Sequence, residues 1–286
     1  MKIPKRILPL VEDGLVDSVL RQLMSGKEAT VYVVQCGDEI RCAKVYKEAN
    51  RRGFHQAVHY TEGRKVKNSR QARAMEKGSR YGRQEQESAW QRSEVDALYK
   101  LASAGVRVPR PFGFFEGVLL MELVTDGNGA AAPRLNDLEL TADEAREFHS
   151  RLIREVVLML CAGIVHGDLS EFNILVDENG PVIIDLPQAV DAAANNNASR
   201  MLKRDVDNLA NYFSQFAPEL KDSQYGSEIW AIYQRGELFP DTVLTGRIEE
   251  NQRIADVKAV MREITTARDD HEARLRYQQL KREEGR

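Results

Sequence analysis

The chain has 286 residues, with 42% hydrophobic and 30% charged side chains, which is enough for one large domain or two lobes around a sizeable core. Its formal net charge of −3 is too small to indicate a partner from bulk charge. No apolar run reaches the roughly 18–20 residues of a membrane span, no secretory leader is visible, and the three cysteines lack metal-ligand spacing. We therefore expect a cytoplasmic protein with no membrane partner.

The first part of the chain is predicted to form a small β-rich lobe over residues 18–124, after a short arm of residues 1–17. β-Branched and aromatic runs alternate there with turn signals, and one helical pattern ends at a glycine. The expected elements are a strand that runs into the Ser25–Glu28 turn, strands Thr30–Cys36 and Ile40–Tyr46, a helix from Gln86 to Gly105, and strands Pro111–Phe115 and Val118–Leu123.

Residues 47–84 interrupt this lobe with a stretch that lacks a clean apolar period. From Lys47 to Arg83, eleven Lys or Arg residues stand against three Asp or Glu residues, a local excess of +8. So long a loop in a compact domain is usually functional or disordered. We predict a flexible basic insertion beside the nucleotide, which recruits RNA, a ribosomal partner or an acidic protein segment.

A larger helical lobe, residues 125–267, is predicted after a linker rich in Gly, Ala, Asn and Pro. Thr141 and Glu144 form a capping box at the start of a helix whose stop signal is Gly163. The elements expected after this helix are a loop from His166 to Asn173, strands Ile174–Val176 and Val182–Ile184, helices beyond Asn197, and a charged tail over residues 268–286. The order predicts an α+β fold with a small β-rich lobe and a larger α-rich lobe.

The strongest chemical signal is the string His166-Gly167-Asp168-Leu169-Ser170-Glu171-Phe172-Asn173, followed by Ile183-Ile184-Asp185. Phosphoryl transfer needs positioning and charge stabilisation more than covalent chemistry. Asp168 can orient the attacking hydroxyl and accept its proton, while the amide oxygen of Asn173 and the carboxylate of Asp185 can coordinate Mg²⁺. A lone aspartate in a loop usually caps or turns the chain, but the full string at this interval predicts a phosphotransferase.

A second group of candidate residues lies in the small lobe. Lys44 lies late in the third predicted strand and can bridge the α- and β-phosphates of ATP, with Glu94 of the following helix holding it in an ion pair. A strand lysine is by itself usually a solvated cation, so this interpretation depends on the surrounding pattern. The turn made of Ser25, Gly26, Lys27 and Glu28 can offer backbone N–H groups to phosphate oxygens.

Together these strings resemble the RIO family of atypical serine/threonine protein kinases. The resemblance rests on Ser25 to Tyr32, His166 to Asn173, Ile183 to Gln188, and Arg204-Asp205-Val206 with Asn208. It runs from about Gly14 to Phe216 and implies a bilobal kinase fold without a full activation segment. About two dozen residues precede the phosphate loop, so we expect the branch without a winged-helix domain, or a bacterial relative.

The resemblance also implies the role of each site residue and the ligands. Ser25, Gly26, Lys27 and Glu28 would form the phosphate loop, Lys44 and Glu94 the phosphate-binding pair, and Glu122 and Leu123 the hinge that meets adenine. Asp168 would be the catalytic aspartate, and Asn173 and Asp185 the ligands of Mg²⁺ or Mn²⁺. The implied reaction transfers phosphate from ATP to Ser or Thr of a protein, with the chain itself a further candidate substrate, or hydrolyses ATP. Met24 and Thr30 depart from the usual family pattern around the phosphate loop.

Two other functions stay open on the sequence. Small-molecule kinases of the aminoglycoside or choline type also carry His-Gly-Asp followed by Asn and Ile-Asp, but the Gly26 loop and Leu186-Pro187-Gln188 argue against them. An ATP-binding scaffold on the ribosome or RNA would not need Lys44, Asp168, Asn173 and Asp185 intact. We further predict that Asp205 has a structural role and accepts backbone N–H groups of the His166 loop.

Overall fold

The computed structural model describes residues 3–26, 28–47 and 80–247, with side chains described from residue 91 onward in the last range. These residues belong to one compact unit, Met1–Arg247. Several predicted features lie outside the described residues: Lys27, nearly all of the basic insertion before residue 80, the helical pattern after residue 247 and the charged tail. In the part of the chain that the structure describes, no helix is long and apolar enough to cross a membrane.

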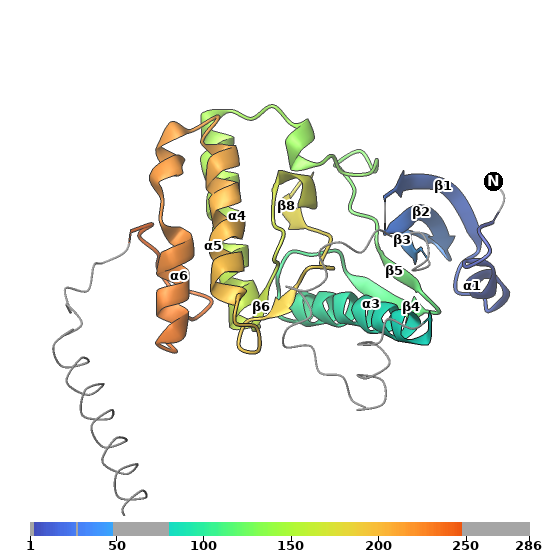
Figure 1. The fold of residues 1–286 in the computed structure, drawn as a ribbon. Coiled ribbons are helices and arrows are strands. Elements are labelled where there is room, and N and C mark those ends of the chain that lie inside the picture. The colour runs from blue at the N-terminus through green and yellow to red at the C-terminus, as the bar shows by residue number, and fades with distance from the viewer. Residues whose placement is uncertain (1–2, 27, 48–79, 248–286) are drawn as a thin grey trace, which may run out of the picture. The chain divides into compact units, whose positions relative to one another are not determined.

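A five-stranded antiparallel sheet forms the small lobe (Figure 1). The strands are β1 (Ser18–Ser25), β2 (Ala29–Cys36), β3 (Glu39–Tyr46), β4 (Pro111–Phe115) and β5 (Val118–Glu122), in the order β1-β2-β3-β5-β4. All five strands were expected from the sequence. Both residues of the Glu116-Gly117 turn have positive φ, 46° and 83°, as a tight turn between twisted antiparallel strands requires.

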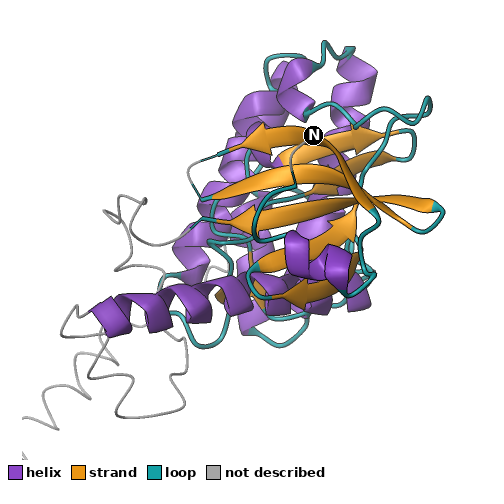
Figure 2. Cartoon of the chain, turned by 90° about the vertical axis from the view of Figure 1, so that its right-hand side faces the viewer, coloured by secondary structure: helices purple, strands orange, loops and turns teal. Residues whose placement is uncertain are grey.

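The N-terminal residues are part of this lobe and not a separate arm. Helix α1 (Leu8–Glu12) packs beside the sheet, and Ile7 and Leu10 are buried against a cluster that includes Val34 and Val118 (Figure 2). Burial of these apolar side chains is what fixes a segment too short to fold alone. The predicted boundary at residue 17 therefore does not separate two bodies.

One long helix, α3 (Arg80–Ser103), follows the insertion and lies against the sheet. It begins six residues earlier than the predicted start at Gln86, inside the range expected for the flexible insertion. It ends as predicted, because Gly105 adopts a φ of +80° and the N–H of Val106 bonds back to the carbonyl of Leu101 at 3.1 Å. Leu101 is fully buried in a core that extends into the large lobe.

Among the described residues of the large lobe, which end at residue 247, the three α-helices are α4 (Ala142–Cys161), α5 (Ala198–Phe213) and α6 (Tyr225–Gln234), which lie side by side in Figure 1. The predicted capping box of Thr141 and Glu144 starts α4, and Gly163, with a φ of +72°, follows its C-cap. Short elements complete the lobe: η2 (Leu135–Asp137), β6 (Ile164–Val165), η3 (Glu171–Asn173), β7 (Ile174–Asp177), β8 (Gly180–Ile183), β9 (Val190–Asp191) and η4 (Pro218–Asp222).

The short strands hold the loop predicted to carry the chemistry. Strand β6 pairs with β9, and β7 pairs with β8, so the loop of residues 166–173 begins and ends at hydrogen-bonded strands. Helix α5 begins at Ala198, soon after β9, which agrees with the expected absence of a full activation segment. The chain has the predicted α+β architecture, a β-rich small lobe and a helical large lobe.

Candidate active site

Hydrogen bonds position the start of the loop between β6 and β7 and leave the side chain of Asp168 exposed. The exposed Asp168 follows the buried His166. The Nδ1 atom of His166 accepts the N–H of Asp168 at 3.3 Å, so the neutral ring carries its proton on Nε2 and donates it to the carbonyl of Ile184 at 3.2 Å. Burial lowers the pKa of His166 and keeps the ring neutral. The histidine is therefore a positioning residue.

Asp205 of α5 fixes the backbone of the same loop through two hydrogen bonds. Its two carboxylate oxygens accept the N–H groups of Gly167 at 2.7 Å and Leu169 at 3.1 Å, and Asn208 donates to the carbonyl of Leu169 at 3.1 Å. Asp205 is 2% exposed, and burial raises its pKa to about 7 although the two N–H donors favour the ionised form. The predicted structural role of Asp205 is confirmed.

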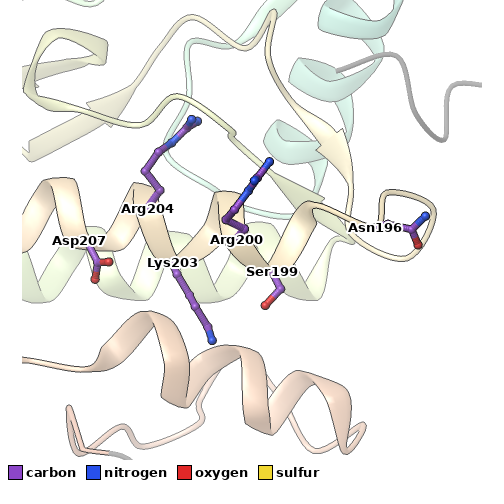
Figure 3. Close-up of a pocket in the computed structure, with 6 residues that line it drawn as sticks. All are labelled: Asn196, Ser199, Arg200, Lys203, Arg204 and Asp207. Carbon is purple, nitrogen blue, oxygen red and sulfur yellow. The ribbon is translucent and has the colours of Figure 1, made fainter. Parts of the chain in front are cut away.

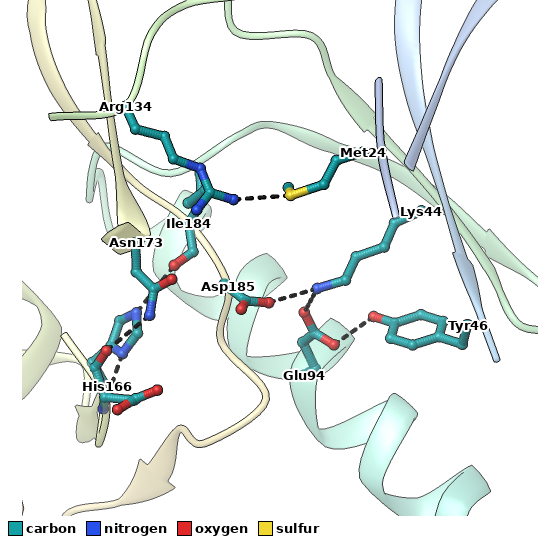
Figure 4. A network of polar contacts seen from close by, with 10 residues as sticks. Met24, Lys44, Tyr46, Glu94, Arg134, His166, Asn173, Ile184 and Asp185 are labelled. Carbon is teal, nitrogen blue, oxygen red and sulfur yellow. Dashed lines mark hydrogen bonds and ion pairs between the residues drawn. The ribbon is translucent and has the colours of Figure 1, made fainter. Parts of the chain in front are cut away.

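An ion-pair network joins the two lobes above this loop (Figure 4). The ammonium group of Lys44, on β3, lies 2.5 Å from Glu94 Oε1 on α3 and 2.9 Å from Asp185 Oδ1 after β8. The hydroxyl of Tyr46 donates to the second oxygen of Glu94 at 2.7 Å. The predicted Lys44–Glu94 pair is present, and the contact with Asp185 was not foreseen.

The charges of this network set one another's protonation. Burial alone would lower the pKa of Lys44, but the carboxylates of Glu94 and Asp185 outweigh it, and the pKa is raised. Burial acts in the opposite sense on Asp185, where Lys44 keeps the pKa below its ordinary value. Both groups are therefore charged at neutral pH.

Asp185 also has an unusual backbone. Its φ is +67°, a left-handed conformation that few residues other than glycine adopt, although aspartate is among those that tolerate it. Such conformations persist at sites where the surrounding structure enforces them, often because function needs the side chain at one place. Here the backbone turns the carboxylate toward Lys44.

Neighbouring charges also shift the pKa of the catalytic candidate Asp168. Desolvation raises the pKa of Asp168, the negative charge of Asp185 raises it further, and the guanidinium of Arg204 on α5 lowers it. A carboxylate with a raised pKa is a stronger base than one in water. Asp168 therefore has both the exposure and the basicity that a proton acceptor needs.

Asn173 and Asp185 offer oxygen ligands that suit a hard divalent cation. The amide nitrogen of Asn173 is used in a 2.9 Å bond to the carbonyl of Asp168, which leaves the amide oxygen for another partner (Figure 4). Among the described residues, no group of three or more His, Cys, Asp or Glu side chains forms a metal cage. Two protein oxygens, completed by phosphates and water, are the donor set typical of Mg²⁺, so the residues present fit this ion.

The phosphate loop is placed in part. The N–H of Gly26 bonds to the carbonyl of Ala29 at 2.9 Å, so this donor closes the turn and does not point at a ligand as the sequence predicted. The hydroxyl of Ser25 lies 3.2 Å from that of Thr30, and Lys47 contacts both Ser25 Oγ, at 3.1 Å, and the carbonyl of Gly26. The loop therefore offers hydroxyls and a cation. The carbonyl of the half-buried Glu28 accepts the N–H of Lys47 at 2.8 Å.

The predicted hinge lies at the end of β5. Glu122 is tied to Arg110 twice, through its own N–H at 2.8 Å and through its carboxylate, which accepts the N–H of Arg110 at 3.0 Å. Leu123 follows the strand, and its N–H has no hydrogen-bond acceptor among the described residues. Of the two candidates, Leu123 is therefore the better placed to bind an adenine ring through its backbone.

Three residues for which the sequence predicted no role in the nucleotide site lie in it: Tyr46, Lys47 and Arg134. The guanidinium of Arg134, in the large lobe, donates to the sulfur of Met24 on β1 at 3.0 Å and thereby connects the lobes (Figure 4). Its charge also lowers the pKa of Asp185. A hydrophobic period or a short motif does not reveal such residues, because their neighbours are distant in the chain.

Comparisons with known proteins agree with this geometry. A family model described as the RIO domain matches residues 30–225. The chain is 36% identical over 209 residues to the RIO-type serine/threonine-protein kinase Rio1 of Haloferax volcanii, covering 72% of this chain and 67% of that protein. It is 29% identical over 213 residues to the serine/threonine-protein kinase rio1 of Schizosaccharomyces pombe, covering 72% of this chain but 40% of that protein. The relative from Chaetomium thermophilum, serine/threonine-protein kinase RIO1, is also 29% identical, with 42% of its length covered.

Proposed function

This chain belongs to the RIO family, and we propose that it is a serine/threonine protein kinase that transfers the γ-phosphoryl group of ATP in a Mg²⁺-dependent reaction. The observation that supports this most directly is the position of Lys44, whose ammonium contacts both Glu94 and Asp185 while Asp185 lies near the loop of Asp168. The residues proposed as phosphate-binding lysine, metal ligand and base therefore lie close together.

In this reaction each side chain has a separate task. Lys44 binds phosphate oxygens, and Glu94 and Tyr46 hold its ammonium in position. Asp168 orients the acceptor hydroxyl and takes its proton as the new O–P bond forms and the bond between the γ-phosphorus and ADP breaks. ADP leaves with the electron pair of that bond.

Asn173 and Asp185 are the residues that would hold Mg²⁺. When bound, the ion neutralises charge on the β- and γ-phosphates. Asp185 forms an ion pair with Lys44 at 2.9 Å. This ion pair must rearrange when Lys44 binds phosphate and Asp185 binds the metal ion. We assign the adenine contact to the Glu122–Leu123 hinge, and the phosphate contacts to Ser25, Lys27 and Glu28 of the predicted loop together with Lys47.

The same groups serve ATP hydrolysis if water replaces the substrate hydroxyl. The purified chain should therefore be incubated with ATP labelled in the γ-phosphate and Mg²⁺, and label should be followed in the chain itself, in added protein, in small alcohols and in free phosphate. We expect label in protein serine or threonine, and at least about a 10²-fold loss in the Asp168→Asn variant with nucleotide binding kept, because a positioned base contributes this much.

Other outcomes would reject this function in distinct ways. Label that appears only in an aminoglycoside or choline would indicate a small-molecule kinase. Binding of ATP without any turnover, alone or with protein and RNA, would indicate a scaffold. Free phosphate as the sole product would indicate an ATPase.

A further inference from the structure

A charged pocket of about 520 Å³ lies along the first half of α5 and the loop before it. Five of the lining residues belong to α5 and recur at intervals of three or four positions, and the sixth lies in the loop before the helix: Asn196, Ser199, Arg200, Lys203, Arg204 and Asp207. Figure 3 shows Arg200 and Arg204 extending to one side of α5 and Lys203 extending toward α6. The catalytic motifs assign no function to this pocket.

The pocket carries an excess of positive charge. Three cations face one carboxylate, Asp207, which gives a formal charge of 3 − 1 = +2 for the six lining residues. Arg200 donates to the side-chain oxygen of Asn197 at 3.1 Å, a neutral partner. In the part of the chain that the structure describes, no carboxylate lies within 4.0 Å of the charged groups of Arg200 or Lys203. These two charges are therefore available to an anion.

The pocket borders the catalytic loop. Arg204, which lines the pocket, donates to the carbonyl of Gly167, the residue before Asp168. Its neighbour Asp205 accepts the N–H groups of Gly167 and Leu169, so one turn of α5 both anchors the loop and forms the pocket wall. An extended segment bound in the pocket can therefore present a residue a few positions away to Asp168.

We propose that this pocket binds acidic side chains that flank the acceptor serine or threonine of the protein substrate. The inference rests on the proposed kinase function and names the class of substrate: a segment rich in Asp or Glu beside the phosphorylated residue. Guanidinium groups present forked donors that match a carboxylate, and lysine adds a point charge. None of the six lining residues is aromatic, so the pocket lacks the stacking surface typical of single-stranded nucleic acid sites.

The test compares three peptides that share one central serine and differ in their flanking residues: glutamate, glutamine or lysine. Steady-state phosphorylation gives kcat and KM for each peptide, and fluorescence anisotropy of labelled peptides measures binding without any turnover. We expect the wild-type chain to prefer the glutamate peptide through a lower KM, by roughly tenfold, as two exposed charge contacts would provide. Equal KM values and equal affinities for the three peptides would overturn the proposal.

The decisive variant is Arg200→Gln/Lys203→Gln, which spares Arg204 because that residue contacts the catalytic loop. It should raise KM and Kd for the glutamate peptide about tenfold, while kcat and peptide-independent ATP hydrolysis stay the same. The double charge reversal Arg200→Glu/Lys203→Glu should shift the preference to the lysine peptide. A control of equal charge change, Lys221→Gln/Arg235→Gln, removes two exposed cations of the same lobe outside the pocket, one of them paired with Glu237, and should leave the glutamate preference intact.

The readouts separate this inference from the kinase function. If no peptide is phosphorylated but the glutamate peptide binds and loses affinity in the Arg200/Lys203 variant, the pocket stands and the proposed reaction fails. If peptides are phosphorylated and the variant behaves like the control, the reaction stands and the pocket proposal is wrong. A labelled RNA oligonucleotide that binds in place of the peptide, and depends on Arg200 and Lys203, would also overturn it.

Discussion

Replacing Gly167 by alanine should destabilise the catalytic loop in two ways, through its positive φ and through a close contact with Gln188. Gly167 has a φ of +81°, where a side chain costs about 1–2 kcal/mol. A Cβ atom built there would also lie 2.6 Å from the carbonyl oxygen of Gln188, too close for the backbone to stay in place. Forcing such a contact typically costs another 1–3 kcal/mol, so we expect the free energy of unfolding to fall by about 2–5 kcal/mol.

The control is Gly236→Ala, because Gly236 has a similar φ of +72° but no atom within 4 Å of a built Cβ. It should lose about 1–2 kcal/mol, from the backbone conformation alone. Urea unfolding of both variants measures the difference, which reports the close approach of Gly167 to Gln188. The two glycines thus form a matched pair.

Activity should divide the two variants more sharply. Relief of the contact at Gly167 must move the loop, which strains the 2.7 Å bond to Asp205 and displaces the adjacent Asp168. A displacement of about 1 Å can cost roughly 10²-fold in rate, whereas Gly236→Ala should keep wild-type kcat. Equal stability losses and equal kcat values in the two variants would refute the assigned geometry.

Three further perturbations test the network above the loop. Asp185→Ala should strongly reduce the thermal stabilisation by Mg²⁺ and ATP, since ligand stabilisation follows affinity; an unchanged shift in a differential scanning experiment would remove Asp185 from the ligand set. Tyr46→Phe deletes the 2.7 Å bond to Glu94 and should raise KM for ATP by about tenfold, because a hydrogen bond to a charged group contributes about 1.5 kcal/mol at the low end; an unaltered KM would show that Glu94 holds its position without it. Because burial raises the pKa of Asp168 and the base acts ionised, kcat should fall as pH drops through a midpoint above 3.8, and Arg204→Gln should move that midpoint higher by removing a charge that lowers the pKa; a midpoint that stays in place would separate Arg204 from Asp168.

Local patterns predicted much of the fold. The strands of the small lobe follow from alternating apolar residues and turn pairs such as Glu116-Gly117, and the capping box of Thr141 and Glu144 marks the start of α4. These signals depend on neighbours a few residues away, so they survive without tertiary information. Helix α3 begins at Arg80, six residues before the predicted start at Gln86. The apolar period there is too weak to mark the beginning of the helix.

The order and spacing of the polar residues also predicted which side chains form the candidate site. Asp168, Asn173 and Asp185 lie on one loop and the strand end that follows it, so their proximity is set by short connections. Lys44 and Glu94 were paired by analogy with the strand–helix order of kinases, and the structure brings them to 2.5 Å. Their catalytic and binding roles stay predictions that the experiments above address.

The sequence by itself thus determined the local elements, the family and the residues of the catalytic string, because each depends on a few neighbouring positions. Only the tertiary structure decided the 2.9 Å contact of Lys44 with Asp185, 141 residues away, the bond of Arg134 to Met24, and the pocket beside Arg204. Such contacts depend on how the lobes and helices pack, and packing is a sum over many weak, distant interactions that no local period records. The residue types predicted the chemistry, and tertiary packing determined which charged side chains contact one another.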